Sequence, residues 1–86
     1  MRIYEGEVRK IGIEVENAVD NNFVIDAADY VITDKDKNII TEGLPTIDGH
    51  RIFTLFSGTD KGVYQVTFKY HIGPEILKAR IFVEVI

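Results

Sequence analysis

The sequence has no cysteine and no tryptophan, and it holds one serine and two histidines. Without cysteine, neither a disulfide framework nor a thiolate metal site can form. No apolar run approaches the roughly 18 residues that a membrane-spanning helix needs. The first 20 residues contain four glutamates, so we expect no signal peptide. These absences exclude a disulfide-rich protein and one with a membrane-spanning helix.

Leucine and alanine are also scarce, with seven residues together against 22 valines and isoleucines. β-branched side chains lose rotamer freedom in a helix and pack well on a pleated sheet. No window of a dozen residues repeats its apolar positions at helical spacing. Because 86 residues can bury one modest core, the sequence predicts a single all-β domain over residues 1–86.

The charge is small and unevenly distributed. A net charge of −4 argues against nucleic acid as the main partner. Residues 1–43 hold ten acids and five bases, whereas residues 44–86 hold four acids and five bases. Two explanations stay open: acidic strands lie beside basic strands within one domain, or copies of the chain meet head to tail.

Segments of alternating or β-branched residues, separated by turn signals, predict six or seven strands. Their spacing is typical of an immunoglobulin-like antiparallel β-sandwich. Turns are indicated at 20–22, at 34–38, where Asn38 can adopt a positive φ, and at Gly73-Pro74. The expected strands are residues 8–16, 23–33 with an irregularity near 26–27, 39–42, 51–57, 63–72 and 75–86.

The last two strands can be placed in register from the sequence alone. A two-residue turn at Gly73-Pro74 sets Phe68 opposite Ala79, and every apolar side chain then faces an apolar one. A slip of one residue would set each of them against a polar side chain. The sequence therefore predicts this hairpin together with its register.

That register has an electrostatic consequence. Lys69 lies directly opposite Lys78, and like charges facing each other across two strands are unfavourable. In an immunoglobulin-like sheet the neighbouring strand is 23–33, and its outward positions include Asp29. We expect the Asp29 carboxylate to reach one of the two lysines.

Tyr64 is a candidate for the tyrosine corner of immunoglobulin-like sandwiches. It begins a late strand and follows a connection that contains Gly62. In such a corner the tyrosine hydroxyl bonds back to the backbone a few residues upstream. We expect Tyr64 to be largely buried, with its hydroxyl bonded within residues 57–62. A plain core tyrosine is the alternative.

No motif predicts catalysis, a metal or a cofactor. The 34–38 loop begins like a calcium loop, but Ile39 and Pro45 stand where the required glycine and glutamate should be. His50 and His71 are too few for a zinc site. Ser57 lacks a nucleophile elbow. We expect a protein that is not an enzyme, with no catalytic residues, no metal and no cofactor.

Apolar residues on outward strand positions are candidates for an interface. An isolated small sandwich should leave its outer faces polar, yet two strands carry apolar residues on both faces. The side chains are either scattered and partly covered, or they form a patch that a partner or second copy covers. The candidate interface residues are Phe53, Ile76, Phe82 and Ile86.

From about Ala28 to the end, the pattern resembles the small immunoglobulin-like domains of bacteriophage virions and prophages, which occur in baseplates, tails and head decorations. The matching stretches are residues 28–34, 39–43, 62–70 and 79–85; Lys37-Asn38 departs from the usual Asp-Gly hairpin. The resemblance implies a structural or adhesive module whose partners are other virion proteins or its own copies. It implies neither nucleic acid nor a membrane as partner. The implied location is the virion, or the host bacterial cytoplasm during assembly.

A stand-alone or cell-surface module that binds a glycan or a protein is the alternative. Sugar platforms usually depend on flat, exposed aromatic rings, tryptophan above all. This chain has no tryptophan, and most of its tyrosines fall on inward strand positions.

Overall fold

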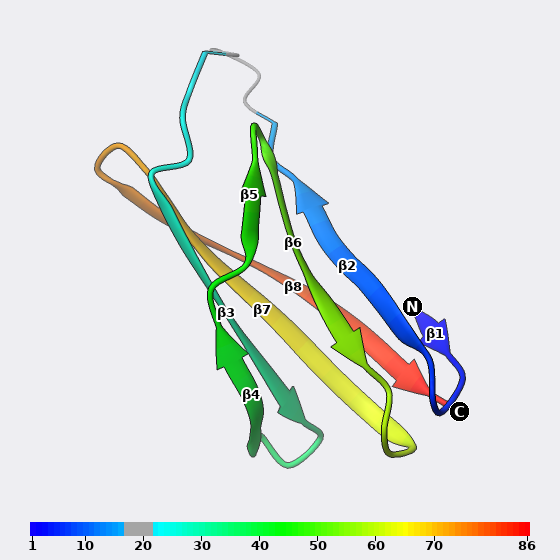
Figure 1. Ribbon diagram of the computed structural model, residues 1–86. Helices are drawn as coiled ribbons and strands as arrows, with labels where there is room; N and C mark the ends of the chain where they lie inside the picture. The colour runs from blue at the N-terminus through cyan, green and yellow to red at the C-terminus, as the bar shows by residue number, and fades with distance from the viewer. Residues whose placement is uncertain (17–21) are drawn as a thin grey trace.

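The computed structural model describes residues 1–16 and 22–86, and the regular structure in these ranges is all β-strand, arranged in two sheets (Figure 1). The five-stranded sheet has the order β1-β8-β7-β3-β4, and the three-stranded sheet has the order β2-β6-β5. The expected two-layer all-β fold is therefore present. The strands are β1 (Arg2–Ile3), β2 (Val8–Glu14), β3 (Ala27–Asp34), β4 (Ile39–Gly43), β5 (Thr46–Asp48), β6 (Arg51–Ser57), β7 (Gly62–Ile72) and β8 (Glu75–Val85).

The core lies between the two sheets and follows from strand alternation. Ile52 and Phe56 point inward from β6, and Val66 and Phe68 point inward from β7; all four are almost fully buried. Successive strand residues point to opposite faces, so Phe53 and Val63 belong to the outer faces. The described part of the chain is elongated, 40 by 20 by 19 Å. It contains no helix that is long and apolar enough to cross a membrane.

Two short strands were not predicted. β1 pairs in parallel with the end of β8, and β5 pairs in antiparallel orientation with the first three residues of β6. Neither is long enough to show an alternating pattern, and both exist because a longer strand supplies the hydrogen-bonding edge. The described residues therefore hold eight strands, where the sequence predicted six or seven.

The predicted strand 23–33 begins later than expected, at Ala27. The preceding segment is held by side chains: the Phe23 and His50 rings stack with centroids 3.9 Å apart, and His50 Nε2 lies 2.9 Å from the Phe23 carbonyl oxygen. The Asp26 carboxylate accepts a hydrogen bond from Gly73 N at 2.9 Å. Residues 20 and 21 of the predicted 20–22 turn lie outside the described residues.

The β7–β8 hairpin has the predicted register, with Phe68 opposite Ala79. Gly73 has φ +56°, and proline fixes φ of Pro74 near −65°, which suits a tight type II′ turn. The charges also lie as expected, because Asp29 faces Lys69 across β3 and β7. The Asp29 Oδ2 atom lies 3.8 Å from Lys69 Nζ, and both side chains are about half-exposed.

The β3–β4 turn differs from the sequence expectation in one detail. Lys37, not Asn38, adopts the positive φ, at 65°. Asn38 is held by Asp34, because its backbone N–H donates to Asp34 Oδ1 and its side-chain amide donates to Asp34 Oδ2. The residue in the left-handed conformation is therefore Lys37.

Candidate functional site

Three features could serve a function: the Tyr64 corner, a slot between the sheets, and exposed apolar side chains. The described residues contain no group of three or more His, Asp or Glu side chains placed to hold a metal ion. His50 is stacked on Phe23, and His71 lies on the outer face of β7.

Tyr64 makes the expected hydrogen bond. Its hydroxyl donates to the Asp60 carbonyl oxygen at 2.8 Å, within the connection between β6 and β7. Its ring packs edge-on against Phe56, with centroids 5.5 Å apart. The side chain is partly buried, not largely buried as expected, because it lies beside a slot that opens to solvent. Burial, then the nearby carboxylates of Asp60 and Asp34, raise the pKa of the Tyr64 hydroxyl.

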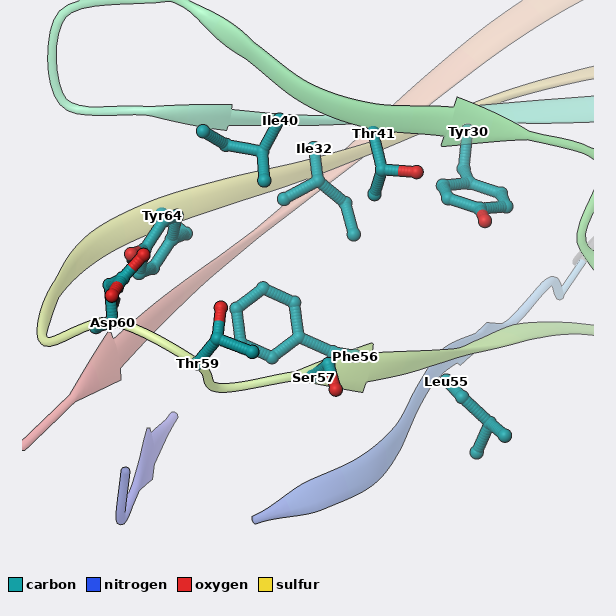
Figure 2. Close-up of a pocket in the computed structure, with 10 residues that line it drawn as sticks. All are labelled: Tyr30, Ile32, Ile40, Thr41, Leu55, Phe56, Ser57, Thr59, Asp60 and Tyr64. Carbon is teal, nitrogen blue, oxygen red and sulfur yellow. Dashed lines mark hydrogen bonds between the residues drawn. The ribbon is translucent and has the colours of Figure 1, made fainter. Parts of the chain in front are cut away.

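The slot lies between β4 and the second half of β6 and has a volume of about 370 Å³ (Figure 2). Ile32, Phe56 and Tyr64 point into it, whereas Leu55 points away. β5 pairs only with Arg51 to Phe53, so in the described residues the edge of β6 that faces away from β2 has no partner strand beyond that point. Asp60 is the only charged residue that lines the slot in the described part of the chain. The slot is suited to apolar side chains and offers no acid–base pair for catalysis.

Two of the four candidate interface residues lie together at one end of the five-stranded sheet. Phe82 and Ile86 are 60% and 40% exposed. Val63, opposite Glu84, and Tyr4, which follows β1 beside the end of β8, add exposed apolar surface there. We call Tyr4, Val63, Phe82 and Ile86 the Phe82 patch. The patch surrounds the ion pair between Arg2 and Glu84, whose nitrogen and oxygen are 2.9 Å apart.

The other two candidates lie elsewhere. Ile76 is exposed on the same outer face, but it is six residues from Phe82 along β8, or about 20 Å at strand spacing. Phe53 belongs to the outer face of the other sheet, is partly buried, and has Lys10 Nζ 4.6 Å from its ring centroid. The four residues therefore do not form one surface.

The sequence analysis missed Tyr4 and Val63. Val63 could have been found, because it shares the outward alternation of Gln65 and Lys69. Tyr4 could not have been found from the sequence pattern. Its position depends on β1, and β1 is a strand only because it pairs with β8.

No protein-family model, curated relative or solved structure matches the chain significantly. A functional interpretation therefore depends on the geometry of the surfaces described above, together with the residue patterns of the sequence.

Proposed function

We propose that this chain is a non-catalytic interaction module with an immunoglobulin-like fold, which associates with a second copy or another structural protein. Strand order supports the fold. If β2 to β8 are given the letters B, C, C′, D, E, F and G, the sheets become BED and GFCC′, as in immunoglobulin sandwiches. Tyr64 then lies near the start of strand F and bonds to Asp60 upstream, which fits a tyrosine corner.

The observation that carries the interaction role is the Phe82 patch. Phe82 is 60% exposed on an outer sheet face whose other positions are mostly polar. Exposed apolar side chains gathered on one surface are typical of protein–protein contacts, and here they lie around the Arg2–Glu84 ion pair. Association would remove this surface from water, and the hydrophobic gain grows with the apolar area covered. The mechanism is surface complementarity, without chemistry or a cofactor.

The proposed setting is a phage or prophage particle. Its support is the resemblance of residues 28–34 and 62–70 to virion immunoglobulin-like domains. The glycan alternative has less support, because the chain has no tryptophan and Tyr30, Tyr64 and Tyr70 pack against the core. Tyr4 and Phe82 are the exposed aromatic side chains of the Phe82 patch.

Sedimentation of the Phe82→Asp variant tests the proposal. We expect the wild type to self-associate as its concentration rises into the high micromolar range. Phe82→Asp should remain monomeric, because an aspartate in the patch would have to be desolvated. Leu55→Asp is the matched control, since Leu55 is 65% exposed on the outer face of the opposite sheet.

Circular dichroism should show that both variants are folded. A monomeric wild type at high concentration would show that self-association is wrong. Equal loss of association in Leu55→Asp would show that the Phe82 patch is not the contact.

A further inference from the structure

A groove of about 400 Å³ lies on the outer face of the five-stranded sheet, beside Phe82. Strand register sets Phe82, Gln65 and Thr33 side by side on β8, β7 and β3. Arg80 precedes Phe82 by two residues and points to the same face. Lys35 and Lys37, from the β3–β4 turn, also line the groove.

The groove lining has a net positive charge, because it holds three cations, Arg80, Lys35 and Lys37, and one carboxylate, that of Asp34. In the described residues, Arg80, Lys35 and Lys37 have no carboxylate oxygen within 4.0 Å. Asp34 is the one acidic residue that lines the groove, and its carboxylate accepts three hydrogen bonds within the turn, from Asp36 N, Asn38 N and Asn38 Nδ2. A cationic groove is thus present in a chain whose net charge is −4.

The groove also offers a hydrogen-bond acceptor and an apolar wall. The Gln65 amide donates from Nε2 to Thr67 Oγ1 at 3.1 Å, which leaves its Oε1 atom to accept from a ligand. Phe82 and Val63 expose apolar surface at the same place. Carboxylates suit the cations, a backbone N–H suits the amide oxygen, and an apolar side chain suits the ring.

We propose that this groove binds an acidic, extended segment of a partner protein, with an apolar side chain on Phe82 and flanking carboxylates on Arg80 and the turn lysines. The proposal rests on the proposed function and specifies the chemistry of the partner. A long polyanion such as nucleic acid fits less well, because the net charge of the chain would repel it.

The test is a nuclear magnetic resonance titration of the labelled full chain with a synthetic heptapeptide that alternates glutamate and leucine. Backbone amide shifts should be confined to residues 33–37, 63–65 and 80–82. Arg80→Glu and Lys37→Glu should each weaken binding by about tenfold, and added salt should also weaken it. Lys10→Glu is the matched control, because it makes the same charge change on the other sheet and should change binding less than about twofold.

The amide spectrum of each variant shows whether it is folded, and either groove variant suffices for the test. The proposal is overturned if the peptide produces no confined shifts, or if a peptide with lysine in place of glutamate binds equally well. It is also overturned if Lys10→Glu weakens binding as much as Arg80→Glu, or if a sulfated oligosaccharide binds the groove more tightly than the peptide.

Sedimentation without peptide separates this inference from the proposed function. If the peptide does not bind but Phe82→Asp still abolishes self-association, the groove proposal fails and the interaction module stands. If the peptide binds with the expected shifts while the wild type stays monomeric, the groove proposal is supported and self-association is wrong.

Discussion

Asp34 orders the β3–β4 turn with its own carboxylate. Oδ1 accepts hydrogen bonds from the backbone N–H groups of Asp36 and Asn38, both at 2.9 Å. The hydrogen bond from Asn38 N is the main reason that the pKa of Asp34 is lowered from its ordinary value of 3.8. This turn also presents Lys35 and Lys37 to the basic groove, so its conformation bears on the proposed binding site.

The first prediction concerns the pH dependence of this turn. Because the pKa of Asp34 is lower in the folded state, its contribution to stability is present above pH 3.8 and is lost as the pH falls through the folded-state pKa. In a nuclear magnetic resonance titration, the Asn38 amide should report a midpoint below 3.8. The Asp34→Asn variant should lose that transition. A midpoint at or above the ordinary value would contradict the hydrogen-bonded turn.

The second prediction concerns the Tyr64 hydroxyl. Tyr64→Phe removes the donor to the Asp60 carbonyl and should lower the free energy of unfolding by about 0.5–1.5 kcal/mol in urea denaturation. Tyr30→Phe is the control: Tyr30 also lines the slot, but its hydroxyl has no hydrogen bond within the described residues. Equal effects of the two substitutions would show that the corner does not stabilise the fold.

At the scale of elements, the close approach of β2 and β6 depends on Gly12. Gly12 lies opposite Phe53 in this antiparallel pair. A Cβ atom at position 12 would lie 2.5 Å from the Ile52 carbonyl oxygen and 2.6 Å from Phe53 Cβ. Glycine is therefore required by contact with the neighbouring strand.

The third prediction follows from that contact. Alanine normally suits a strand better than glycine, but Gly12→Ala should lower the free energy of unfolding by about 1–3 kcal/mol, because backbone atoms must move apart. Gly43→Ala is the matched control, since its Cβ would meet side-chain atoms of Tyr30 and not backbone, the nearest being the hydroxyl at 3.3 Å. Thermal unfolding of the two variants measures the difference, and a neutral Gly12→Ala would contradict the close strand approach.

On the outer face of β3, β7 and β8, only one of the two lysines that face each other has an acidic partner. Lys69 faces Lys78 on β8 and Asp29 on β3, and the carboxylate takes the nearer lysine at 3.8 Å. A pair this exposed contributes at most about 1 kcal/mol. Lys78 has no carboxylate within 4.0 Å in the described residues, so the outer face keeps positive charge.

At the scale of the whole molecule, β1 joins the beginning of the chain to its last strand. Ile86 N donates to the Ile3 carbonyl oxygen at 2.9 Å, and Figure 1 shows the two termini side by side. The Ile3 side chain is only 1% exposed, within the same core as Val83 and Val85. The two-residue strand β1 thus forms one edge of the five-stranded sheet and contributes a core side chain.

The fourth prediction tests this contribution to the core. Ile3→Ala should lower the free energy of unfolding by about 2–5 kcal/mol, because it leaves a cavity between the sheets. Val8→Ala, at a residue that is 57% exposed, should change it by less than about 0.5 kcal/mol. Urea denaturation measures both variants. A neutral Ile3→Ala would show that β1 does not belong to the folded core.

The uneven charge of the two halves has a partial explanation within one chain. The Asp29–Lys69 pair joins an acid of the first half to a base of the second, whereas the Arg2–Glu84 pair joins a base of the first half to an acid of the second. Two bases of the second half, Lys78 and Arg80, have no carboxylate oxygen within 4.0 Å in the described residues. For these two, contact between copies of the chain stays a prediction.

The sequence by itself determined the all-β class and the β7–β8 register. These follow from local pattern, because β-branched composition, strict alternation and a two-residue turn fix neighbours that are close in the chain. The approach of Asp29 to Lys69 or Lys78 was expected from the strand order of an immunoglobulin-like sheet, and the structure selects Lys69. For Tyr64 the sequence predicted a hydroxyl bonded within residues 57–62, and the structure identifies the acceptor as the Asp60 carbonyl, four residues away.

Only the tertiary structure decided which outward residues share a surface. Alternation shows that Phe53, Ile76, Phe82 and Ile86 point outward, but it does not show to which sheet or end of a strand each belongs. The fold separated Phe53 and Ile76 from Phe82, and it added Tyr4 and the basic groove. The physical reason is that β1 and β5 form on edges supplied by β8 and β6, far away in the sequence, so no local pattern encodes them.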